Sequence, residues 1–190
     1  MIVDLLRQEH CNIEKLLLVL ERELNVFDRG ERPDYEVIRA VIDYFQIYPE
    51  AYHHPQEDIV FGKLKARDPC AAANIGDLAA EHRSGAERLR QVALAVESVL
   101  MDQEVLRHTV GDIIRDFISY ERRHIAMEER DFFPAAVKAL QPEDWAEIAS
   151  SRRPGQKDPL FSEIAEDRFD VVRRHILQWE QEAEAERERC

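Results

Sequence analysis

The sequence predicts an all-α protein: an antiparallel, up-and-down four-helix bundle with an extra helix at its C-terminal end. Leu, Ala, Glu and Arg dominate the composition, and these residue types favour helices. Only six Gly and eight Pro occur among 190 residues, too few for a chain of many short strands. Four long segments repeat apolar residues at steps of three and four, and short connections join them, which is typical of an antiparallel bundle.

The first two helices are expected over residues 2–27 and from residue 34 to about residue 64. In the first helix the apolar residues lie on one face, and Asp4 is a candidate N-cap. In the second helix Pro49 and Pro55 each remove one backbone hydrogen bond and crowd the preceding turn. We therefore expect kinks or a short break at these two prolines.

The third and fourth helices are expected over about residues 73–101 and 103–140, the fourth with Asp102 as its N-cap. Each carries one apolar stripe at helical spacing, as the first two do. With four amphipathic helices of this length, residues 1–142 are expected to form the bundle.

The remaining residues, 143–190, are expected to form an appendage to the bundle. Pro142–Ala149 predicts a short helix with Pro at its first position. Residues 152–158 predict a loop, and a further helix is expected over 159–180, followed by a charged end that frays into solvent. Because this helix has an aromatic face that needs burial, we expect it to pack on the bundle or to form a homodimer with a second copy.

The charge balance excludes several classes of partner. There are 26 Lys and Arg against 39 Asp and Glu, a net charge of −13, which repels nucleic acids and anionic membranes. No apolar run approaches the length of a membrane span, and no basic region precedes an apolar stretch at the start, as a secretory signal requires. Cys11, Cys70 and Cys190 are too far apart to suggest a disulfide framework or a thiolate zinc site, so we expect a cytoplasmic protein.

Each of the four bundle helices places one histidine within its apolar stripe, and two of these histidines have a glutamate four residues later. The residues are His10, His53, His82 and His124, with Glu57 and Glu128. Residues four apart lie on one face, about 6 Å apart along the axis, so both can reach the same metal pair. A core cannot hold six such groups unless they satisfy one another or bind a cation. Imidazole and carboxylate without thiolate suit iron or manganese and tolerate zinc.

The segments around these residues resemble the hemerythrin-like, or HHE cation-binding, family of four-helix di-iron proteins. The matching motifs are Glu9-His10, His53–Phe61, Glu81-His82 and His124–Pro134. The resemblance covers about residues 1–140, and the two longer motifs are the specific ones.

The resemblance implies a ligand set and a cofactor. The implied ligands are His10, His53, Glu57, His82, His124 and Glu128. They would hold two iron ions joined by an oxo or hydroxo bridge and by the two glutamates, with zinc or manganese as substitutes. Oxygen-carrying hemerythrins have a fifth histidine where this chain has Ala86. The chain is therefore more similar to the bacterial branch with four His and two Glu, and each iron would keep one open position.

Neighbouring residues offer alternatives. His54 and Asp58 form another pair four residues apart, although the apolar residues downstream favour His53 and Glu57. The candidates for contacts with the ligands are Tyr120, Glu14 and His54. Core packing is the simpler role for the tyrosine. The remaining histidines, His108 and His175, lie off the stripes and are expected at the surface.

The sequence therefore predicts a non-haem di-iron protein that binds, senses or reduces a small ligand such as dioxygen, peroxide or nitric oxide. An iron-handling factor that repairs iron centres is an alternative, and so is a helical interaction module with a structural metal. Turnover of the small ligand, transfer of iron to a protein lacking its cluster, and a redox-silent metal would distinguish the three.

Overall fold

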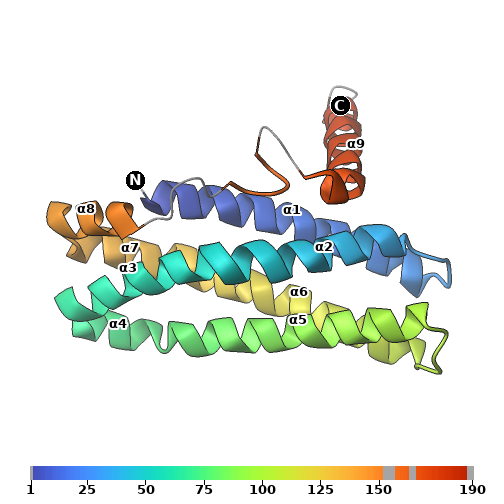
Figure 1. Cartoon of the computed structure of the whole chain (residues 1–190), viewed down its shortest axis with the longest axis horizontal. Helices are drawn as coiled ribbons and strands as arrows, with labels where there is room; N and C mark the ends of the chain where they lie inside the picture. The colour runs from blue at the N-terminus through green and yellow to red at the C-terminus, as the bar shows by residue number, and fades with distance from the viewer. Residues whose placement is uncertain (1, 152–156, 163–165, 188–190) are drawn as a thin grey trace.

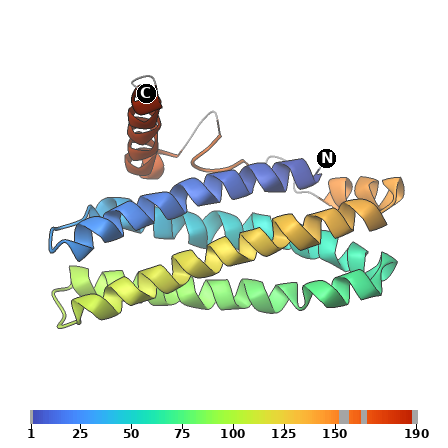
Figure 2. The same ribbon diagram turned by 180° about the vertical axis from the view of Figure 1, so that it is seen from behind.

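The computed structural model describes residues 2–151, 157–162 and 166–187, and every regular element in these ranges is helical (Figure 1). Four long arms lie side by side in an antiparallel arrangement (Figure 2). The arms are α1 (Ile2–Asp28), α2 with α3 (Tyr35–Tyr48 and His54–Arg67), α5 (Leu78–Leu100), and α6 with α7 (Arg107–Met127 and Phe133–Ala139). Arm α1 packs against α2 and α6, and α5 packs against the same two. This confirms the predicted all-α bundle.

The first arm begins earlier than its predicted cap. Asp4 lies inside the first turn of α1 and is not its N-cap, because the helix already starts at Ile2. Val3 and Leu6 are fully buried, so the apolar stripe holds this turn against the bundle. The second arm starts at Tyr35, one residue after the predicted start, and the Asp34 side chain caps it by accepting hydrogen bonds from two backbone N–H groups of α2.

The prolines of the second arm produce a π-helical turn and not a break. Residues Pro49–His53 form this turn between α2 and α3, and the N–H of His54 donates to the carbonyl of Pro49 five residues back. A matching π-helical turn, Glu128–Phe132, lies between α6 and α7, where the N–H of Phe133 donates to the carbonyl of Glu128. Such turns insert an extra residue into a helix and often occur at functional sites.

The third and fourth arms begin later than predicted. The expected helix 73–101 is divided, because α4 (Pro69–Ile75) ends at Gly76, whose φ of +99° suits glycine. Asp77 then caps α5 through its side chain. Asp102 is not the N-cap of α6: it has φ +51° in a turn, and Leu106 occupies the cap position.

The C-terminal part differs from the prediction at both ends of its helix. After α8 (Pro142–Ser151), residues 152–156 of the predicted loop lie outside the described ranges. Asp158 caps a turn by accepting from the N–H groups of Leu160 and Phe161, so Pro159 does not begin the helix. Instead α9 spans Asp170–Arg187, after a 3₁₀ turn at Asp167–Phe169, and extends past residue 180.

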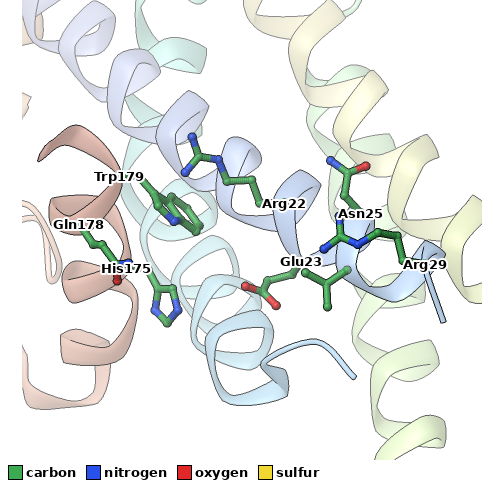
Figure 3. Close-up of a pocket in the computed structure, with 8 residues that line it drawn as sticks. Arg22, Glu23, Asn25, Arg29, His175, Gln178 and Trp179 are labelled. Carbon is green, nitrogen blue, oxygen red and sulfur yellow. The ribbon is translucent and has the colours of Figure 1, made fainter. Parts of the chain in front are cut away.

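Helix α9 crosses the face formed by α1 and α2 (Figure 1). Val172 and Ile176 of α9, and Phe169 of the 3₁₀ turn before it, are buried in the same apolar cluster as residues of those two helices. Between α1 and α9 lies a groove of about 410 Å³, where the guanidinium of Arg22 stands 4.2 Å from the ring centroid of Trp179 (Figure 3). Packing on the bundle thus buries Phe169 and leaves Phe161 and Trp179 half-buried.

The buried apolar residues form two clusters, one toward each end of the bundle. Along α1, Leu6 belongs to one cluster and Ile13 to the other, with His10 between them. The same change of cluster occurs along the other three arms, at the positions of the remaining predicted ligands. A polar layer therefore separates the two apolar cores. None of the described helices is both long enough and apolar enough to cross a membrane.

Candidate metal centre

The six predicted ligands meet in this polar layer. Each of them is buried, and the side chains of Glu57 and Glu128 are fully inaccessible to solvent. The histidines come from four different arms: His10 from α1, His53 from the π-helical turn before α3, and His82 and His124 from α5 and α6.

Glu57 lies between two sets of histidines. Its Oε1 is 3.3 Å from His10 Nε2 and 3.2 Å from His53 Nε2. Its Oε2 is 3.4 Å from His82 Nε2 on the opposite side. The carboxylate therefore turns one oxygen toward each set.

Glu128 repeats this arrangement from the facing arm. Its Oε2 is 3.3 Å from His10 Nε2, while its Oε1 is 3.2 Å from His124 Nε2 and 3.7 Å from His82 Nε2. Both carboxylates thus lie between the same two pairs of histidines: His10 with His53 on one side, and His82 with His124 on the other.

The converging atoms lack hydrogen bonds. Although these nitrogen and oxygen atoms approach to ion-pair distance, most make no hydrogen bond of acceptable geometry with the described residues. These atoms are Nε2 of His10, His82 and His124 and both carboxylate oxygens of Glu57 and Glu128. A buried polar group without a partner is costly, whereas a cation at the centre would satisfy all of these atoms together. The residues present therefore fit a metal.

In the metal-free cluster the histidines and the two glutamates stabilise each other's charged forms. Burial alone lowers the pKa of His10 and His82, but contacts with Glu128 and Glu57 outweigh it and raise each pKa to about 9. The pKa values of the other two histidines are raised as well. Burial alone raises the pKa of the two glutamates, but the histidines outweigh it and hold both below the usual range. Without a metal, the protonated form of these histidines is thus favoured by the two carboxylates, and metal binding would compete with protons for the same nitrogens.

A second layer of carboxylates holds the outer nitrogen of the histidines. The Nδ1–H of His53 donates to Glu9 at 2.8 Å, and the hydroxyl of Tyr48 donates to the other oxygen of Glu9 at 2.7 Å. The Nδ1–H of His10 donates to Glu129 at 2.9 Å. Such contacts fix the tautomer and orientation of a ligating imidazole.

These outer carboxylates are not among the residues predicted from the sequence. Glu9 directly precedes one predicted ligand and Glu129 directly follows another. Neighbouring helix positions differ by about 100°, so each of them faces the adjacent arm rather than the centre. The sequence offered one signal for them: in both cases an acidic residue stands directly next to a predicted ligand.

The two members of the alternative pair take different places. Asp58 is 48% exposed and lies 3.2 Å from Nδ1 of His82, outside the centre. His54 is only 11% exposed and joins the cluster: one of its ring nitrogens lies within 4.8 Å of ligand atoms of Glu57, His82 and His124. The structure thus brings in both adjacent histidines of the second arm, His53 and His54.

The chain was compared with known proteins. A family model described as the hemerythrin HHE cation binding domain matches residues 1–136. The chain belongs to the hemerythrin HHE family. Hemerythrin HHE domains bind metal cations, commonly iron, and the cluster of histidines and glutamates fits that role. Neither the comparison with curated proteins nor that with solved structures gave a match.

Two other predicted residues have different partners in this hemerythrin HHE domain. Glu14 lies outside the cluster, which corrects its expected contact with the ligands: it is 41% exposed and accepts hydrogen bonds from Arg122. The hydroxyl of Tyr120 donates to the backbone and side chain of Glu81 at 2.7 Å. Tyr120 therefore ties α6 to α5 one residue before His82, while its ring lies parallel to that of His124.

The histidines off the stripes lie away from the centre. His108 is exposed at the start of α6. His175 is half-buried and lines the groove between α1 and α9, where its Nδ1–H donates to the carbonyl of Val171 (Figure 3). Neither histidine belongs to the candidate ligand clusters of the described residues.

Proposed function

We propose that this hemerythrin HHE protein holds two iron ions and binds, senses or reduces a small ligand such as dioxygen, peroxide or nitric oxide. The observation that carries the proposal is the placement of Glu57 and Glu128. Each turns one carboxylate oxygen to one pair of histidines and the other oxygen to the second pair. A single ion would use only one side of each carboxylate, whereas two ions use both.

The residues divide between the two ions accordingly. His10 and His53 would hold one iron, and His82 and His124 would hold the other, with the two glutamates shared. Bound iron would exchange electrons with the small ligand and would offer it a coordination position.

The chain contributes orientation and exclusion of water. Glu9 and Glu129 hold Nδ1–H of their histidines, so that Nε2 presents its lone pair to the centre. Apolar clusters on both sides keep the ligands buried. Since the six side chains are so little exposed, the site admits only ligands of a few atoms.

Elemental analysis of freshly purified protein, expressed with ample iron, tests the proposal. We expect two irons per chain and a Mössbauer spectrum of ⁵⁷Fe-enriched protein that changes when nitric oxide or azide is added. One iron per chain, or zinc alone, would contradict the two-iron site. A spectrum that neither reagent changes would contradict the small-ligand role.

A further inference from the structure

We propose that a row of tyrosines supplies electrons, one at a time, for the reduction of hydrogen peroxide at the metal centre. The inference rests on the proposed two-iron site. It deepens that function by naming the oxidant and the route by which electrons reach a buried site. Tyr48 loses the electron first, and Tyr52 replaces it from the surface.

The row follows one face of the second arm. Three of the chain's five tyrosines stand four residues apart in this arm. They are Tyr44 and Tyr48 of α2 and Tyr52 of the π-helical turn that follows. The ring centroid of Tyr48 is 5.7 Å from the centroid of each of the other two rings. Aromatic rings at this separation are in contact, so an electron can pass from one ring to the next.

Tyr48 is joined to a predicted ligand through a carboxylate. Its hydroxyl donates to Glu9 at 2.7 Å, and the other oxygen of Glu9 accepts from Nδ1–H of His53 at 2.8 Å. A phenol that loses an electron becomes a strong acid, so its proton must leave together with the electron. Glu9 can take this proton along the existing hydrogen bond and return it afterwards. Both residues are buried, which keeps solvent from the exchange.

Tyr52 connects the row to solvent. Tyr44 and Tyr48 are buried, whereas Tyr52 is half-buried. A reductant can therefore reach the Tyr52 ring, and its phenolic proton can pass to water. Tyr44 closes the row at the other end. Burial raises the pKa of its phenol well above the usual range, and its hydroxyl donates to Asp158 at 2.8 Å.

Tyr120, the other phenol beside the centre, has surroundings that oppose oxidation. Its ring centroid lies 6.3 Å from that of His124, but its hydroxyl donates to Glu81. The guanidinium of Arg88 stands 4.2 Å from the ring centroid. A cation against an aromatic face attracts the electrons of the ring and makes their removal harder. We therefore assign the electron route to Tyr48.

The electrons and protons balance. Hydrogen peroxide takes up two electrons and two protons and yields two waters. In each of two passages, Tyr48 gives one electron to the centre and one proton to Glu9. Tyr52 then gives one electron to oxidised Tyr48, which takes its proton back from Glu9, while the proton of Tyr52 passes to water. A one-electron reductant such as ascorbate returns one electron and one proton to Tyr52, and the protons that peroxide takes up come from solvent.

The test adds hydrogen peroxide to the iron-loaded full chain. Without ascorbate, we expect a tyrosyl radical in the EPR spectrum, with a hyperfine splitting that narrows when the protein carries ring-deuterated tyrosine. Tyr48→Phe, which keeps the ring but not the oxidisable hydroxyl, should lose this signal. Tyr52→Phe should keep the signal and slow peroxide-dependent oxidation of ascorbate by at least about tenfold. Tyr35→Phe, at a half-buried position of the same helix, should match the wild type in both measurements.

The outcomes separate this inference from the function on which it rests. A wild type with two irons but no tyrosyl signal overturns the tyrosine route and leaves the two-iron site intact. A wild-type signal in Tyr48→Phe also overturns it, as does an equal loss of ascorbate oxidation in Tyr35→Phe and Tyr52→Phe. If Tyr48→Phe loses iron, Tyr52→Phe decides the question, because it leaves the hydrogen bonds of Glu9 in place. Fewer than two irons in the wild type overturns the proposed function and this inference with it.

Discussion

Raising the pH should destabilise the metal-free protein and should not destabilise the metal-loaded one. In the folded metal-free protein, contacts with Glu128 and Glu57 raise the pKa of His10 and His82 from 6.5 to about 9. A histidine whose pKa is raised by folding contributes its stabilisation below pH 6.5 and loses it as the pH rises through the folded pKa. The relevant window is therefore pH 6.5 to about 9.

The shifts give the magnitude. A rise in pKa from 6.5 to about 9 corresponds to about 3 kcal/mol per histidine, at 1.36 kcal/mol per unit. Both histidines use the same two carboxylates, so their contributions are not independent, and the expected loss is between about 3 and 6 kcal/mol. This is a large part of the 5–15 kcal/mol typical of a folded domain. Glu121, whose burial raises its pKa from 4.5 to about 7, titrates at the lower end of this window. Most of its loss of stability occurs below pH 6.5, and the remainder adds to the decrease expected from the histidines.

Urea unfolding followed by circular dichroism at pH 6.5, 7.5 and 9 measures the effect. The urea midpoint of the metal-free protein should fall across this range. The midpoint of the iron-loaded protein should hold or rise, because protons compete less with the metal at higher pH. His10→Gln should flatten the decrease in the metal-free protein, while His108→Ala should leave the slope at its wild-type value.

Two results would refute the reasoning. One is a metal-free midpoint that stays constant or rises between pH 6.5 and pH 9. The other is an equal slope in His10→Gln and the wild type, since the buried imidazolium would then not be the group that titrates.

Three further outcomes are expected. His82→Ala should lower bound iron, measured by elemental analysis, whereas His108→Ala at an exposed position should not; equal loss in both would contradict the ligand assignment. Glu9→Gln should weaken iron binding about 10- to 100-fold in a chelator competition, because the imidazole of His53 loses the carboxylate that orients it. Glu14→Gln on the same helix is its control, and an equal effect there would count against the orienting role. Phe133→Ala removes a fully buried ring and should cost about 3–5 kcal/mol in urea unfolding of the metal-free protein; a loss below about 1 kcal/mol would exclude the packing role.

The helical arms were largely predictable because apolar periodicity is a property of each segment by itself. Their ends were less so. The predicted start at residue 73 fitted Ile75 into the stripe of the third helix, but the left-handed Gly76 separates that residue from α5. A turn of this kind depends on one residue and leaves the apolar period on both sides unchanged. The same difficulty applies to the late start of α9.

The sequence by itself determined which face of each arm carries a histidine or glutamate, because residues three and four apart share a face whatever surrounds the helix. It therefore indicated a polar layer across a four-helix core. Which side chains meet across that layer was decided by the tertiary structure. The contacts of Glu129 with His10 and of Asp58 with His82 each join two arms, and they depend on how those arms are rotated against each other. His54 reaches the cluster only through a π-helical turn, whose shift of phase no helical period within the sequence reveals.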